Sequence, residues 1–233
     1  KKVKVIFTVD CGTLSFEAIN FAKENNVDVI VLDHHQSEVR LPNAFSIVNP
    51  NRLDDNSNLQ YLCAAGVSFM FLVSLNRELR NKNWFKENNL KEPNLIEYLD
   101  LVSLGTVCDV VPLIGLNRAI VKQGLKVLKS KKNLGLKTLL DICKIDASPS
   151  IYHLGYLLGP RINAGGRVGK CSHGANLLLN KDPKYSFKLA SELDQFNKER
   201  QMLEKDLLKK ILNETKNSSS DPVLILSGKN WHE

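Results

Sequence analysis

The first 32 residues alternate between two apolar runs and one amphipathic stretch, and this pattern constrains the fold more than any other feature. Val3–Val9 and Val27–Leu32 are short runs rich in β-branched residues, which favour strands. Between them, Leu14–Glu24 repeats apolar residues at helical spacing. Strand, helix and strand at this spacing predict a βαβ unit with two parallel strands and a right-handed crossover. The sequence therefore predicts an α/β protein.

Ionisable residues follow both predicted strands. Asp10 comes directly after the first, and Asp33, His34 and His35 come directly after the second. Ligands of parallel sheets bind outside the carboxyl ends of the strands, where all four residues fall. Adjacent histidines can also be a hydrogen-bonded surface pair. Their position beside a second acid favours a metal site, and the mixture of carboxylate and imidazole suits manganese or magnesium.

The middle of the chain reads as helical, with one short strand in "SIVNP". The predicted helices cover about residues 62–79, 95–104, 118–129 and 136–143. Gly105 interrupts the second of these patterns, and Pro112 forbids its continuation. We therefore expect Asp109 in a loop or a tight turn, where it either binds metal or caps a helix.

The segment "GPRINAGGRVG" at 159–169 is predicted to be a glycine-rich loop. Its glycines would let backbone amides approach a phosphate, and Arg161 and Arg167 can each fork onto phosphate oxygens. Asn163 lies between them. The alternative is a connection whose arginines face solvent. The pattern differs from the phosphate-binding loops of nucleotide-binding folds, so no nucleotide cofactor is inferred.

The C-terminal fifth of the chain begins with a long amphipathic stretch from Pro183 to about Lys216 without internal glycine or proline. It predicts one long helix. The polar "NSSSDP" ends it, and "VLIL" from Val223 is predicted to start a strand of a second domain.

Composition bounds the class of protein. A chain of 233 residues with 43% hydrophobic residues can bury a large core. Its apolar runs are shorter than the roughly 18 residues of a membrane span, and no secretory signal is recognisable. We expect a soluble, cytoplasmic protein that does not bind membranes. The net charge of +7 favours an anionic partner, with nucleic acid a modest favourite.

In this order and at these separations, "TVDCG", "VLDHH", "SLGTVCDVVPL" and "GPRINAGGR" resemble the DHH phosphoesterase superfamily, and within it the branch of single-strand-specific DNA exonucleases. The resemblance implies a parallel sheet flanked by helices. It divides the chain into a DHH domain at 1–182, a connecting helix at 183–217 and the start of a second α/β domain at 218–233. It also implies hydrolysis of single-stranded DNA from the 5′ end in recombination and repair.

The resemblance assigns a role to each motif residue. Asp10, His34 and Asp109 would bind Mn²⁺ or Mg²⁺ in a two-metal site, Asp33 would orient a histidine, His35 would contact the scissile phosphate or lie near the metals, and Arg161, Asn163 and Arg167 would hold the DNA backbone. Single-stranded DNA would be the partner, with a helicase and a single-strand-binding protein as further candidates.

One family motif is missing from the sequence. The family's HxDxD segment, which precedes the first strand, is absent, as is most of the C-terminal domain. We therefore expect a fragment that binds one ion weakly and is inactive alone. Two other functions remain open: a DHH enzyme acting on short oligoribonucleotides or cyclic dinucleotides, and a nucleic-acid-binding relative without catalysis.

Overall fold

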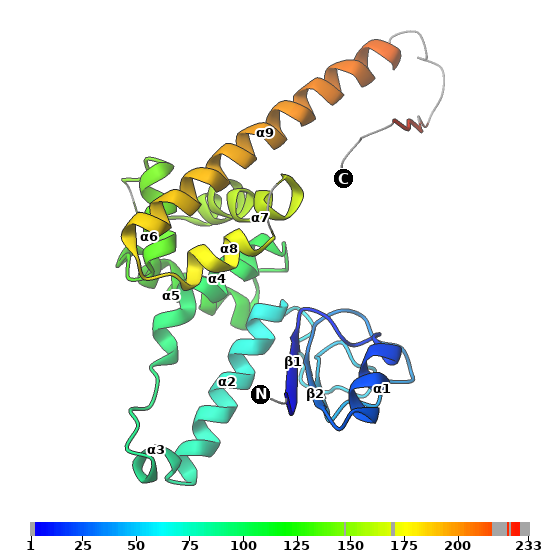
Figure 1. Ribbon diagram of the computed structural model, residues 1–233, viewed down its shortest axis with the longest axis vertical. Helices are drawn as coiled ribbons and strands as arrows, with labels where there is room; N and C mark the ends of the chain where they lie inside the picture. Colours follow the sequence, from blue (N-terminus) through cyan, green and yellow to red (C-terminus); the bar gives the residue numbers. More distant parts are fainter. Residues whose placement is uncertain (1–2, 147, 169–170, 216–222, 224, 229–233) are drawn as a thin grey trace. The chain divides into compact units, whose positions relative to one another are not determined.

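The computed structural model describes residues 3–146, 148–168, 171–215, 223 and 225–228 (Figure 1). The chain divides into two compact units, which we describe one at a time. The sheet unit is Lys1–Lys132 with Ala147–Tyr156, and the helical unit is Asn133–Asp146 with Leu157–Glu233. The predicted DHH domain at 1–182 has different bounds and stays a prediction.

Three parallel strands in the order β1-β2-β3 form the sheet. They are β1 (Val5–Val9), β2 (Asp28–Leu32) and β3 (Ser46–Val48), and α1 (Phe16–Glu24) connects the first two. The predicted βαβ unit and the short third strand are confirmed. Register pairs Val9 with Leu32 and Leu32 with Val48, so the three strands end at one edge.

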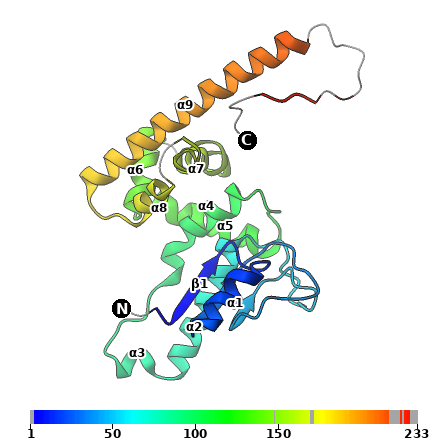
Figure 2. The same ribbon diagram turned by 45° about the vertical axis from the view of Figure 1, so that its right-hand side comes forward.

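The two faces of β2 pack against different helices, as its alternating side chains require. Val29 and Val31 form a buried cluster with Ile19 of α1. On the other face, Leu32 packs with Val67 of α2 (Ala64–Asn81). Figure 2 shows α1 and α2 beside the strands. Strand β2 is therefore covered on both faces, as parallel strands usually are, whereas most side chains of β1 are exposed.

The rest of the sheet unit is helical: α3 (Trp84–Glu87), η1 (Leu95–Tyr98), α4 (Leu99–Cys108), α5 (Gly115–Lys129) and the start of η2 (His153–Leu158). The predicted interruption at Gly105 is wrong, because α4 continues through it to Cys108. A Cβ at Gly105 would lie 2.7 Å from Ala65 Cβ, so the glycine allows α4 to pack closely against α2. Asp109 is the C-cap residue that follows α4, and it lies in a turn, as the sequence predicted.

The helical unit contains α6 (Leu134–Ile142), α7 (Gly159–Val168), α8 (Ser172–Leu179) and α9 (Pro183–Thr215). The first half of α9 packs against α6, α7 and α8 (Figure 1). Its buried residues there include Leu189, Ala190 and Leu193. The long helix predicted from Pro183 is confirmed as far as Thr215.

The strand predicted from Val223 is not found at Val223, Ile225 or Leu226, the part of "VLIL" that the structure describes. The remainder of that prediction, with Lys216 and most of 218–233, lies outside the described residues. The second domain therefore stays a prediction.

The glycine-rich segment is a helix, α7, and the predicted loop is wrong over 159–168. Ala164 is fully buried, and Gly165 is buried beside it. At Gly174 of α8, a Cβ would lie 2.8 Å from Ile162 Cγ2, so α7 and α8 also meet closely. Each glycine in a helix costs about 1 kcal/mol relative to alanine. Packing of α7 against α8 and α9 outweighs this cost.

No helix within the described ranges has both the length and the apolarity that crossing a bilayer would require.

Candidate metal centre

The candidate centre lies where β1, β2 and α4 end. The register of β1 and β2 carries Asp10 and Asp33 out of the sheet at the same edge, and the Asp10 amide donates a hydrogen bond to Leu32 O at 3.0 Å. Asp109 reaches this place from the C-terminus of α4. The structure therefore brings together residues that lie far apart in the sequence.

His34 stands between the two carboxylates. Its Nε2 lies 3.2 Å from Asp10 Oδ1 and 3.6 Å from Asp109 Oδ2. The His34 side chain is 15% exposed, whereas those of Asp10 and Asp109 are 65% and 39% exposed. One open, acidic corner thus presents an imidazole nitrogen and two carboxylates to solvent.

Two residues of this corner have a left-handed backbone. Asp10 has φ 64° and Val110, which follows Asp109, has φ 57°. Aspartate tolerates this region, but a β-branched valine rarely adopts it. A helix of this kind usually has glycine at the position of Val110. Strained backbone of this kind clusters at functional sites, and here it flanks both candidate carboxylates.

Asp33 lies beneath the corner and is 1% exposed. Its carboxylate accepts hydrogen bonds from the Thr13 amide at 3.0 Å, the His34 amide at 2.8 Å and His35 Nδ1 at 2.7 Å. Burial is the largest single influence and opposes its charge. The hydrogen bonds from Thr13, His35 and His34 together outweigh burial and hold the pKa of Asp33 well below its usual value. Asp33 is therefore an ionised anchor for its neighbours.

His35 is fixed by that anchor. Its hydrogen bond to Asp33 raises the pKa of His35, as do the charges of Asp10 and Asp109, whereas burial lowers it. The ring stands 4.6 Å from that of His34, centroid to centroid. Because Nδ1 faces Asp33, Nε2 is the nitrogen left for a ligand or a substrate.

The donor set fits a divalent cation. Asp10, His34 and His35 each offer one ligand atom, and these atoms all lie within 4.8 Å of one another. Asp109 stands outside that group, yet its carboxylate faces the same nitrogen of His34. Burial, and then the nearby charge of Asp10, raise the pKa of Asp109, against the opposite effect of the two histidines. A cation would relieve this repulsion, and carboxylate with imidazole suits manganese.

Two asparagines that the sequence did not single out hold the centre in place. Asn49, 3% exposed, donates from Nδ2 to Thr13 Oγ1 at 2.9 Å and to His35 O at 2.8 Å. Asn51 donates from its own amide to Asn49 Oδ1 and from its side chain to His34 O. The signal that could have found them is "VNPN", two asparagines directly after a predicted strand. They tie the third strand end to the histidine loop.

The predicted phosphate-binding residues lie on α7 of the helical unit. Arg161 donates from Nε to Asp194 Oδ1 and from Nη1 to Leu157 O, both at 2.8 Å, and its side chain is 16% exposed. Asn163 is exposed, and the side chain of Arg167 lies outside the described residues. Their contact with DNA stays a prediction, and Arg161 already has two acceptors within the protein.

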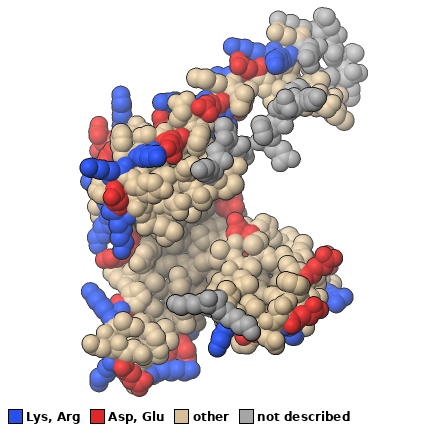
Figure 3. Space-filling model, viewed as in Figure 1, with Lys and Arg blue, Asp and Glu red and all other residues tan. Residues whose placement is uncertain are grey.

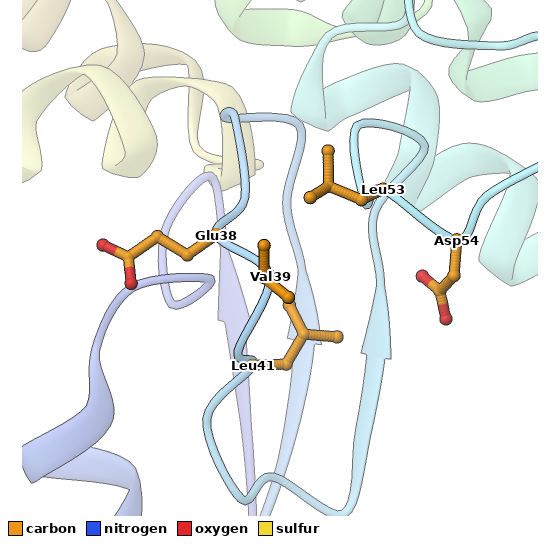
Figure 4. A pocket seen from close by; sticks show the side chains of 5 residues that line it. All are labelled: Glu38, Val39, Leu41, Leu53 and Asp54. Carbon is orange, nitrogen blue, oxygen red and sulfur yellow. The ribbon is translucent and has the colours of Figure 1, made fainter.

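Charge is not gathered into one basic patch on the face that Figure 3 shows, where Lys and Arg alternate with Asp and Glu along α9. A hollow of about 270 Å³ in the sheet unit is lined by Glu38, Val39, Leu41, Leu53 and Asp54. Figure 4 shows its apolar side chains inside and both carboxylates at its margins. Asp54 is paired with Arg52 at 2.6 Å. The hollow contains no histidine and does not compete with the metal centre.

Comparisons with known proteins show which family and which solved structures this chain resembles. Residues 2–106 match the DHH family, N-terminal domain. The single-stranded-DNA-specific exonuclease RecJ of Dickeya dadantii is 41% identical over 206 residues, which cover 88% of this chain and 36% of that protein.

Two solved structures are similar as well. The crystal structure of RecJ from Thermus thermophilus in complex with Mn²⁺ has a TM-score of 0.76 and 32% identity, over 94% of this chain and 31% of that one. Its counterpart with Mg²⁺ has a TM-score of 0.65 and 30% identity, over 94% of this chain and 29% of that one. The resemblance and the α/β fold inferred from the motifs are confirmed, over about a third of the relatives' length.

Proposed function

Because residues 2–106 match the DHH family, N-terminal domain, and most of the chain is similar to RecJ, we propose that this protein is a metal-dependent phosphodiesterase. Its substrate would be single-stranded DNA, degraded from the 5′ end to nucleotides during recombination and repair. The observation that carries the proposal is the convergence of Asp10, His34 and Asp109, since His34 Nε2 lies within 3.6 Å of both carboxylates.

Asp10, His34 and Asp109 would hold Mn²⁺ or Mg²⁺, the ions named with the two similar structures. When bound, such ions polarise a phosphoryl oxygen, lower the pKa of a water and stabilise a leaving oxygen. Asp10, the most exposed of the three, is the candidate to bridge two ions. The further ligands of a two-metal site are expected from the HxDxD segment, which this sequence does not contain.

The remaining residues would position the reacting groups. Asp33 keeps Nδ1 of His35 occupied, so that Nε2 can face the scissile phosphate. Asn49 holds the carbonyl of His35 and fixes the same loop from β3. Arg161, Asn163 and Arg167 would hold the DNA backbone, with Arg161 oriented by Asp194.

The wider assignments belong to the same proposal. Residues 1–182 would be the DHH domain, 183–217 the connecting helix and 218–233 the start of a C-terminal domain. The protein would act in the cytoplasm, with a helicase and a single-strand-binding protein as partners. Lys and Arg outnumber Asp and Glu by 32 to 25, which supports an anionic substrate.

The comparisons favour DNA over the smaller substrates. Relatives named single-stranded-DNA-specific exonuclease RecJ match 85% to 99% of the chain. This weighs against oligoribonucleotides and cyclic dinucleotides. The sequence of the full-length protein tests the third possibility, a binding relative without catalysis. Acids spaced as HxDxD would complete the metal site, and their absence would favour a binding role.

The decisive test is a nuclease assay of the full-length protein with Mn²⁺ on 5′-labelled single-stranded DNA, the matching duplex and linear dinucleotides. We expect release of mononucleotides from the single strand, with the duplex spared. If the protein prefers dinucleotides, they rather than DNA are its substrate. Inactivity on every substrate would favour a binding protein without catalysis.

A second measurement tests the backbone contacts. Replacing Arg167 by Gln should weaken binding and reduce the slope of log affinity against log salt by about 0.7, because one fewer phosphate is neutralised on a single strand. Lys137, on α6 of the same unit, provides the control substitution to Gln. An unchanged slope for the Arg167 variant would make this arginine structural.

A further inference from the structure

Two tyrosines on the sheet unit stack on each other in the open. Tyr152 lies in the helical turn before η2 and Tyr156 within η2. Their ring centroids are 5.2 Å apart and the ring planes meet at 23°. The two residues remain 58% and 72% exposed. Neither tyrosine takes part in the proposed metal centre, so the centre does not explain why two large aromatic rings are exposed.

The inner side of the same segment is anchored. Leu154 is fully buried, and its carbonyl accepts a hydrogen bond from Cys108 Sγ at 3.6 Å. A Cβ at Gly155 would lie 3.3 Å from Val107 Cγ1, so the backbone at Gly155 lies close to the Val107 side chain. The tyrosines thus sit on a segment that is packed against the last turn of α4.

That last turn carries a residue of the metal centre. Cys108, which holds the Leu154 carbonyl, directly precedes Asp109, whose carboxylate faces His34. At the other side, the Ser150 amide donates to His153 Nδ1 at 2.9 Å and closes the start of the segment. The aromatic pair and the centre are therefore connected through one short stretch of packed backbone, within one compact unit.

We propose that Tyr152 and Tyr156 form a stacking platform for the bases of a single-stranded nucleic acid whose backbone is held at the metal centre. The inference rests on the proposed function. Every base has an aromatic face, so such a platform accepts any sequence. Bases in a duplex are already stacked on their neighbours, so the platform adds binding energy to single strands and contributes to their selection.

The test is equilibrium binding by the full-length protein with Mn²⁺, on oligonucleotides whose 5′ linkages are phosphorothioates that slow hydrolysis. A fluorescent thymidine oligonucleotide is compared with one of equal length that carries abasic sites at every internal position. Wild type should bind the thymidine strand more tightly. Replacing both tyrosines by Ala should weaken binding of that strand about tenfold, because the aromatic faces on which bases stack are lost. Binding of the abasic strand should not change.

Three controls separate stacking from other causes. The double Phe variant should restore binding, because the rings remain. Tyr98→Ala removes a tyrosine of similar exposure, 53%, from η1 and should bind both strands like wild type. The salt slope of the double Ala variant should match wild type, because no phosphate contact is lost. Thermal unfolding confirms that each variant is folded.

Two results would overturn the platform. One is equal binding of the thymidine strand by wild type and the double Ala variant, as expected if the rings serve a protein partner. The other is an equal loss on both strands, which would mean a backbone contact or a structural role. Either result leaves the proposed function intact if wild type still degrades single strands with Mn²⁺. If wild type degrades no single-stranded DNA, both the proposed function and the platform are wrong.

Discussion

The strand ends of the sheet unit and helix α7 of the helical unit both carry predicted functional residues, but they are built differently. At the strand ends, the backbone itself sets the site, because the parallel register of β1 and β2 fixes where Asp10 and Asp33 emerge. On α7, Arg161 is placed by packing and by Asp194, a residue from α9. A site set by register can be located from local sequence, whereas a site set by packing depends on distant residues.

The two regions also differ in how their polar groups are satisfied. The carboxylates of Asp10 and Asp109 face a histidine and solvent, an arrangement that a cation completes. The carboxylate of Asp194 is 13% exposed and already has two cations, Arg161 at 2.8 Å and Lys198 at 2.8 Å. The first region is thus open to a ligand, and the second is internally neutralised. Substitutions should therefore affect chemistry in the first and stability in the second.

The largest effect is expected from Asp109→Ala in the full-length protein. Loss of one candidate ligand should lower single-strand hydrolysis with Mn²⁺ by at least about a hundredfold, because several kcal/mol of charge stabilisation is lost. The melting temperature should change little. Asp28→Ala, at the opposite end of β2, is the control and should retain activity. A fully active Asp109 variant would remove this residue from the centre.

Asp33→Asn tests the anchor beneath the same region. The amide cannot reproduce the charge that His35 Nδ1 faces at 2.7 Å, so His35 loses its fixed orientation. We expect metal affinity or activity to fall by about 10- to 100-fold, the usual effect of losing an orienting partner. Titration calorimetry with Mn²⁺ and the nuclease assay measure the two separately. If Asp54→Asn, an exposed acid of the same unit, has the same effect, the anchor is not specific.

What could be predicted follows the same division. The runs at Val5–Val9 and Asp28–Leu32 contain enough β-branched residues to predict strands. The βαβ rule then makes the strands parallel and places Asp10 beside His34. Pro112 predicts that α4 ends near Asp109, but only the motif assigns Asp109 to this corner, since no local pattern shows that the helix ends beside His34. The hydrogen-bonding role of Asn49 depends on β3 lying next to β2, a tertiary fact.

The prediction failed where packing overrides local propensity. Glycines in "GPRINAGGRVG" favour a loop when judged alone, but Ala164 and Gly165 are buried in α7. Gly105 was expected to interrupt a helix, whereas it gives α4 room to approach Ala65. In both places glycine serves close contact between helices, which the sequence of one helix cannot reveal.

Ala164→Leu tests whether α7 depends on that close contact. Ala164 is fully buried, so the larger side chain must displace neighbours. We expect a loss of about 1–3 kcal/mol in the free energy of unfolding, typical of overpacked cores. Denaturant unfolding measures it, and Asn163→Leu at the exposed neighbouring position is the control. Equal stability of the two variants would mean that 159–168 tolerates bulk as a loop does.

The smallest effect concerns Asp194 and depends on pH. Burial is the largest influence and raises its pKa, but hydrogen bonds with Lys198 and Arg161 outweigh burial and hold the pKa below the ordinary 3.8. A carboxyl whose pKa is lowered by folding stabilises the folded state above its unfolded pKa, and this contribution is lost as pH falls through its folded pKa. Asp194→Asn should thus lower the free energy of unfolding by about 1 kcal/mol at pH 7.

The difference in free energy of unfolding between this variant and wild type should shrink below about pH 4. Denaturant unfolding between pH 7 and pH 3 measures both curves, with Asp146→Asn as the exposed control. A difference that stays constant over this range would mean that Asp194 acts through packing rather than charge, and the contrast between an open and an internally neutralised region would lose its electrostatic basis.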